Sequence, residues 1–195
     1  SPEYQIPLEK RCNTAVYVLS RSSGEGSDRK LLPGDVLLTE SEIRDILALQ
    51  KLYPVFLLVL NVGGPVDLTP ILAETEDILL LGQLGVETGA ILADILLGTA
   101  YPSGKLATTW ARPDSVCPAA QFGQKEETRY GEGIYVGYRY FDSAGIAPVF
   151  PFGFGLGYTD FTVEAKSVSV AGDLITVSAE VRNTGAFPGK QVVQL

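Results

Sequence analysis

The sequence predicts an α/β domain with a mainly parallel sheet and helices on both of its faces, followed by the start of an all-β sandwich. Three observations support this fold class. Near-continuous apolar runs alternate with helical patterns before about residue 114, which is typical of parallel strands buried on both faces. Beyond that point Gly, Pro and aromatic residues replace the helical signal. From Phe161 onward, short runs bounded by turn residues predict strands.

The elements of the α/β part follow in the order strand, helix, strand. The first helix is marked by a capping box, Thr39-Glu-Ser-Glu42, and Pro54 ends it. The second strand stops at Gly63-Gly64-Pro65. We expect strands at 15–19, 55–61 and 78–81, helices at 39–52, 67–74 and 86–97, and an extended segment at 105–110.

For the part of the chain beyond about residue 114, the sequence predicts loops and strands only. Residues 135–158 are expected to form loops and short strands, with Tyr138 and Tyr140 on one face of a strand and Arg139 on the other. Strands are also expected at 162–170, 174–182 and 190–195. An immunoglobulin- or fibronectin-like sandwich needs about 7 strands and about 100 residues. We therefore expect one domain at 1–158 and only the beginning of a second at 159–195.

Composition excludes several classes of function. The 195 residues carry a net charge of −8 without a basic face, so a nucleic-acid partner is not expected. No apolar run approaches the roughly 20 residues that cross a membrane. Histidine is absent, which removes imidazole-based triads and the commonest metal ligand. Cys12 and Cys117 are too few for a zinc cage, and a disulfide between them is left open, as is the compartment, cytoplasmic or secreted and periplasmic.

The segment Ser20 to Arg29 follows the first predicted strand, where open α/β sheets place their ligands. Within it, Glu25 lies between two glycines, and a raised pKa would let it act as a general acid. On spacing alone, a solvated glutamate in a surface loop is the simpler interpretation. A phosphate-binding loop is disfavoured because the GxxxxGK[ST] spacing is missing and Glu25 and Asp28 would repel phosphate. Glu132, in a second Gly-Glu-Gly at 131–133, is a competing carboxylate.

Several segments together resemble glycoside hydrolase family 3, in the region that follows its catalytic barrel. The chain opens with Ser-Pro and contains no methionine, so we expect it to be part of a longer protein. The order and spacing of the matching segments cover nearly the whole chain, which makes the joint signal specific. They are Ser23-Gly-Glu-Gly-Ser-Asp-Arg29, Gly34-Asp35, 59–64, 85–89, 93–98, 102–106, 131–140 and 151–158.

The resemblance implies a retaining β-glycosidase built from a (β/α)8 barrel, an α/β sandwich and a fibronectin type III-like domain. It implies that Glu25 is the general acid/base, that Asp28 and Arg29 position its loop or contact substrate, and that the nucleophilic Asp belongs to the barrel. A β-glucoside or related oligosaccharide is the implied substrate, with β-xylosides as an alternative, and neither cofactor nor metal is implied. Some branches of the family use an Asp/His pair of the barrel instead.

Two other classes remain open at this stage. The chain could be a non-catalytic interaction module that packs on a barrel carrying all the chemistry, and Glu25 would then be dispensable. A flavodoxin-like nucleotide or flavin binder shares the α/β periodicity but lacks a phosphate loop. The resemblance implies that the barrel covers one face of the α/β domain. Without the barrel we expect this face to be exposed and the fragment to be inactive and to self-associate.

Overall fold

The structure is a computed structural model that describes residues 12–22, 28–116 and 126–195. The chain divides into two compact units. The first comprises residues 1–89 and 108–152, and the second comprises residues 90–107 and 153–195. Among the described residues, no helix combines the length and apolar character that a membrane crossing needs.

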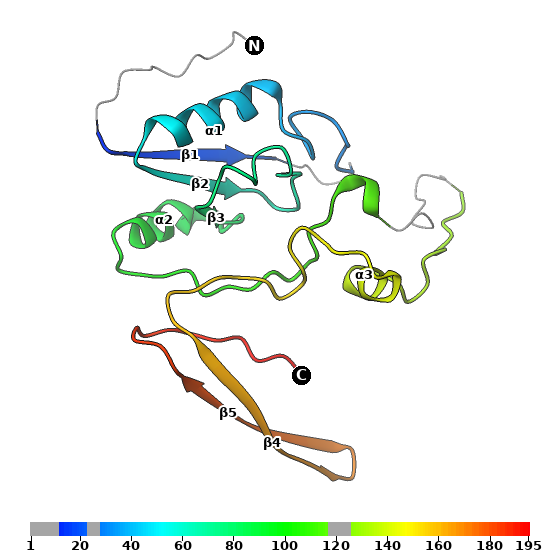
Figure 1. Cartoon of the computed structure of the whole chain (residues 1–195). Coiled ribbons are helices and arrows are strands. Elements are labelled where there is room, and N and C mark those ends of the chain that lie inside the picture. Colours follow the sequence, from blue (N-terminus) through cyan, green and yellow to red (C-terminus); the bar gives the residue numbers. More distant parts are fainter. Residues whose placement is uncertain (1–11, 23–27, 117–125) are drawn as a thin grey trace. The chain divides into compact units, whose positions relative to one another are not determined.

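A three-stranded parallel sheet forms the centre of the first unit (Figure 1). Its strands are β1 (Thr14–Ser20), β2 (Val55–Asn61) and β3 (Ile78–Leu80), in the order β1-β2-β3. The register pairs Val16 with Leu57 and Leu60 with Leu80. The predicted parallel sheet is therefore confirmed.

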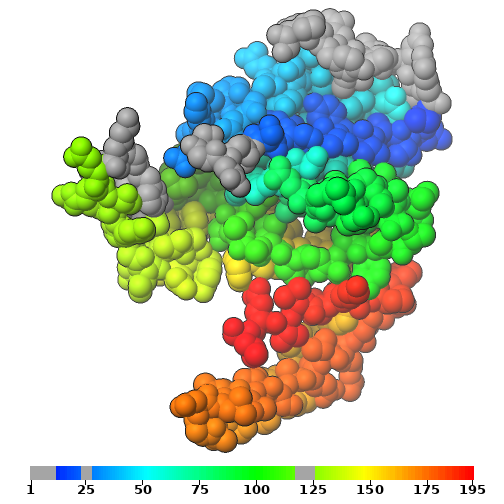
Figure 2. Space-filling view, turned by 180° about the vertical axis from the view of Figure 1, so that it is seen from behind, coloured from blue at the N-terminus to red at the C-terminus, as the bar shows by residue number. Residues whose placement is uncertain are grey.

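The core of this unit is built around β2, because the central strand is covered by neighbours on both sides. Leu58 and Val59 are fully buried, and helix α1 (Glu40–Leu52) adds Ile46 to the core. The helix begins with the predicted capping box, in which Thr39 and Glu42 satisfy each other's backbone N–H groups. Strand β1 lies at the edge of the sheet and reaches the surface, where its blue segment is visible in Figure 2.

Residues 67–74 form turns rather than the predicted helix. The Asp67 side chain accepts a hydrogen bond from the backbone of Thr69, as at a helix N-terminus, and single-turn bonds run from Leu72 to the Leu68 carbonyl and from Thr75 to the Ile71 carbonyl. The backbone of Asp67 also bridges to Leu37. A short segment cannot offset the cost of nucleating a helix when its first residues are bound elsewhere.

Helix α2 (Thr88–Leu96) follows a 3-10 turn, η1 (Gly85–Glu87), and confirms most of the helix predicted at 86–97. A second 3-10 turn, η2, covers Pro113–Ser115. The segment expected to be extended at 105–110 forms no strand. Trp110 pairs with Phe150 in an isolated bridge, and the backbone of Leu106 donates to the Phe154 carbonyl at 2.8 Å and accepts from Gly153 at 2.7 Å.

The prediction of strands around Tyr138 and Tyr140 is wrong, because helix α3 (Tyr138–Ala144) occupies this segment. Tyr138 packs against the ring of Phe152, with 5.2 Å between ring centroids, and Phe141 is buried. Tyr138 and Phe141 are three residues apart, which places them on one side of a helix. Gly145 ends the helix in the left-handed conformation, where glycine is favoured.

The second unit contains a β-hairpin, whose strands β4 (Phe161–Ala171) and β5 (Leu174–Asn183) are antiparallel and confirm two predicted strands. A two-residue turn at Gly172-Asp173 joins them, and Gly172 has a positive φ of 61°. The third strand, predicted at 190–195, is not formed. A strand needs a partner for its backbone groups, and the described residues offer this segment none.

Candidate active site

The carboxyl ends of the three parallel strands meet at one edge of the sheet. The chain leaves β1 at Arg21, whose backbone N–H donates to the Asn61 carbonyl at 3.2 Å. It leaves β3 toward Gln83, whose side-chain amide donates to the Arg21 carbonyl at 3.2 Å. A Cβ atom at Gly63, beyond β2, would overlap the Gln83 side chain, so glycine permits this close approach. Arg21 thus connects all three strand ends.

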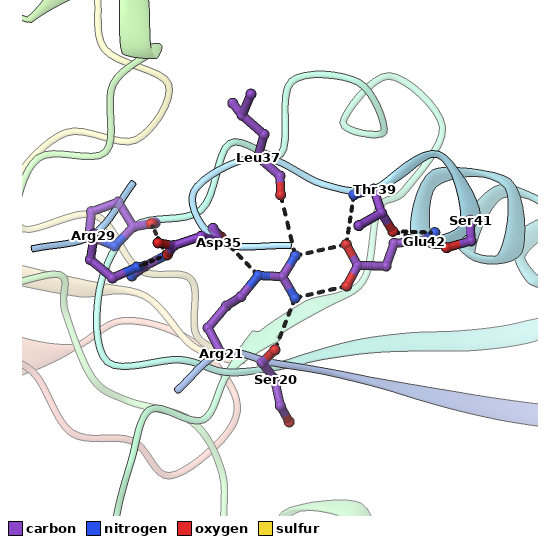
Figure 3. Close-up of polar contacts among 9 residues, drawn as sticks. Ser20, Arg21, Arg29, Asp35, Leu37, Thr39, Ser41 and Glu42 are labelled. Carbon is purple, nitrogen blue, oxygen red and sulfur yellow. Dashed lines mark hydrogen bonds and ion pairs between the residues drawn. The ribbon is translucent and has the colours of Figure 1, made fainter. Parts of the chain in front are cut away.

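The Arg21 guanidinium is buried at this edge and forms a bidentate ion pair with Glu42 (Figure 3). Its Nη1 and Nη2 atoms lie 2.8 and 2.7 Å from the two carboxylate oxygens. The remaining N–H groups donate to backbone carbonyls of Ser20 at 2.9 Å, Asp35 at 2.8 Å and Leu37 at 3.5 Å. All five N–H groups of the guanidinium therefore have an acceptor.

Opposing effects set the pKa of Glu42. Burial raises the pKa, but hydrogen bonds from the Arg21 side chain and from the Thr39 backbone lower it, and the result lies below the ordinary value. Because its pKa is lowered, the carboxylate of Glu42 is ionised at neutral pH and balances the charge of the buried guanidinium. At neighbouring Tyr17, burial, reinforced by the charges of Glu42 and Asp45, raises the pKa of the hydroxyl.

A second cluster follows residue 28, where Arg29 forms an ion pair with Asp35. The other oxygen of Asp35 accepts from the backbone N–H of Lys30 at 2.6 Å. That backbone bond, followed by the bond from Arg29, lowers the pKa of Asp35. Arg29 also reaches the Pro65 carbonyl at 3.5 Å, beyond the end of β2. Arg29 thereby links its own segment to Asp35 and to the loop after the second strand.

The structure describes some of the site residues predicted from the sequence and not others. Glu25 lies outside the described residues, so its role stays a prediction, and Cys117 lies outside them as well, so its pairing with Cys12 stays open. Asp28 is exposed, and Arg29 is partly buried with Asp35 as its ion-pair partner. Glu132 lies in a turn, where its backbone carbonyl accepts from Tyr135 at 2.9 Å.

Sequence reasoning missed the pairing of Arg21 with Glu42. One signal was present in the sequence. An arginine follows a predicted strand directly, and an acidic residue lies in the capping box of the next helix. If that helix packs on the sheet, both side chains lie at the same sheet edge and can pair. No group of three or more Cys, Asp or Glu side chains suited to a metal ion occurs in residues 12–22, 28–116 and 126–195.

Comparison with known proteins identifies the family of this fold. The profile of the glycosyl hydrolase family 3 C-terminal domain matches residues 7–158. A β-glucosidase of Rhizobium radiobacter is 38% identical over 194 residues, which cover 95% of this chain and 24% of that protein. Thermostable β-glucosidase B of Acetivibrio thermocellus is 39% identical over 178 residues, 88% of this chain and 23% of that protein.

Solved structures agree with the sequence relatives. The structure of β-glucosidase 3B from Thermotoga neapolitana in complex with α-D-glucose matches with a TM-score of 0.81 at 39% identity, over 90% of this chain and 26% of that one. The chain therefore belongs to glycoside hydrolase family 3, as a C-terminal α/β domain. It spans about a quarter of the length of these relatives.

Proposed function

We propose that this chain is part of a retaining exo-β-glycosidase, most simply a β-glucosidase, and that it supplies the general acid/base Glu25. The observation that supports the proposal is that β1 ends at Ser20, at the sheet edge described above, and that the Ser23–Arg29 motif follows in the sequence two residues after Arg21. This edge is where open parallel sheets bind their ligands. The β-glucosidases among the relatives support the same activity.

In this mechanism two carboxyl groups act on one glycosidic bond from two domains. The nucleophile of a (β/α)8 barrel attacks the anomeric carbon while protonated Glu25 gives its proton to the leaving oxygen. In the second step Glu25 takes a proton from the water that releases the sugar, so the acid is regenerated. The α/β domain would pack on that barrel, and this fragment would be inactive alone because it holds one carboxyl group of the two.

The proposal is tested in the complete enzyme with Glu25→Ala and an activated aryl β-glucoside, with and without azide. Such a substrate needs little acid catalysis, whereas its glycosyl-enzyme intermediate waits for a base. We expect azide to raise the rate and to yield the β-glycosyl azide, which also identifies the sugar.

Glu132→Ala is the matched control, because Glu132 occupies the second Gly-Glu-Gly of the chain. It should keep the wild-type rate and show no response to azide. A wild-type rate for Glu25→Ala would refute the proposal and favour a non-catalytic module that packs on a barrel with all the chemistry.

A further inference from the structure

Arg21 is the residue on which four segments of the first unit converge. Its backbone joins the end of β1 to Asn61 at the end of β2, and to Gln83 after β3. Its side chain binds Glu42 in the first turn of α1 and the carbonyls of the segment before that helix. Figure 3 shows the guanidinium between the helix start and that preceding segment.

The residues on either side of segment 22–28 are held by the same stretch of chain. Arg21 precedes it and is bound to Asp35, Leu37 and Glu42. Arg29 follows it and is bound to Asp35. The stretch is itself tied down, since Leu37 bridges to Asp67 and the Val36 carbonyl accepts from Asp67 at 2.7 Å. Both departure points of the segment are thus set by one tied stretch.

We propose that Arg21, through its ion pair with Glu42, is a positioning residue for the acid/base step. This inference rests on the proposed function, because segment 22–28 contains Glu25. The Arg21 side chain is 7% exposed and all its donors are used. It therefore acts through the backbone that it fixes and does not contact the sugar. A displacement of about 1 Å in a catalytic group can lower a rate about 100-fold.

Stability alone is an insufficient account of this pair. A buried ion pair is often no more stabilising than apolar side chains of similar volume, because both charges lose their hydration. Its fork geometry, by contrast, fixes the direction of both partners. Lysine would keep the charge but would lose the fork and two of the five donors. Arg21→Lys therefore separates charge from geometry.

The experiment uses the complete enzyme and compares kcat/KM for two aryl β-glucosides, one with an activated leaving group and one with a poor one. This parameter reports the step in which the leaving oxygen is protonated. Arg21→Lys and Glu42→Gln should lower kcat/KM about 10- to 100-fold for the poor leaving group. The activated substrate should change much less. Lys51 lies near the other end of α1 and forms an exposed ion pair with Glu74, so Lys51→Met should leave the ratio of the two values unchanged.

A purely structural role would lower both values by the same factor, since fewer molecules would be folded, and that result would overturn the inference. Unchanged values would overturn it as well. The double variant Arg21→Met/Glu42→Leu covers the case in which single variants unfold. It removes both charges together and should fold, yet keep the altered ratio. Restoration of the wild-type ratio by this double variant would count against positioning.

Glu25→Ala, measured in the same series, separates the two proposals. If this variant loses activity on the poor leaving group while Arg21→Lys does not, only the positioning role fails. If Glu25→Ala itself keeps the wild-type ratio, the proposed function fails and the role of Arg21 fails with it.

Discussion

Glu42→Gln should lower the free energy of unfolding by about 3 kcal/mol. The substitution keeps the shape of the side chain but removes two charge-assisted bonds of 2.7 and 2.8 Å to Arg21. The guanidinium would stay buried without a counter-charge. Breaking such a pair costs about 3 to 5 kcal/mol, and the lower end applies because carbonyls of Ser20, Asp35 and Leu37 still accept from Arg21.

Urea unfolding of the chain measures this loss through Trp110, the single tryptophan, which is buried in the same unit. At a typical urea slope, the midpoint should fall by about 1 to 2 M. Lys51→Met removes an exposed ion pair of 3.2 Å with Glu74 and should cost at most about 1 kcal/mol. Equal midpoints for Glu42→Gln and Lys51→Met would refute the reasoning.

At acidic pH, wild type and Glu42→Gln should no longer differ in their unfolding midpoint. Burial raises the pKa of Glu42, but the hydrogen bonds from Arg21 and Thr39 together lower it by more, so the folded pKa lies below the ordinary 4.5. A depressed carboxyl pKa stabilises the folded state above the unfolded pKa, and this stability is lost as pH falls through the folded pKa. The two unfolding midpoints should therefore converge below about pH 4.5, and a widening gap would contradict the assigned direction.

Four further substitutions test packing and backbone geometry by thermal or urea unfolding. Leu58→Ala in the fully buried centre of β2 should cost about 3 kcal/mol, whereas Val168→Ala on the exposed β4 should stay within about 0.5 kcal/mol. Equal losses would contradict the burial of β2. Gly63→Ala should cost about 1 kcal/mol, because its Cβ would displace Gln83 from the end of β1. Gly89→Ala in helix α2 meets open space and should instead stabilise by about 0.5 to 1 kcal/mol, so a loss would contradict that geometry.

The sheet was predictable because its strands carry their own boundaries. Strand β2 occupies 55–61 as expected, since an apolar run between Pro54 and Gly63 has one favourable way to be buried. Helix α1 was predictable for a similar reason, because its capping box marks the first turn. In both cases the decisive interactions lie within a few residues of each other.

The errors arose where distant contacts decide the conformation. Tyr138 and Phe141 have side chains that favour strands, yet packing against Phe152 selects a helix between Gly137 and Gly145. Residues 190–195 have the composition of a strand but no partner among the described residues. Tertiary packing overrides local propensity in such segments.

Glu42 takes part both in a local interaction, the capping box, and in a tertiary contact with Arg21. By the local rule, a capping box accepts Gln as readily as Glu at this position, so Glu42→Gln should be neutral. The tertiary contact gives the opposite expectation, because only a carboxylate neutralises Arg21, 21 residues earlier in the chain. A helix start that depends on charge is therefore the sign that α1 is coupled to the end of β1. The same side chain that begins the helix thereby fixes the point from which segment 22–28 leaves the sheet.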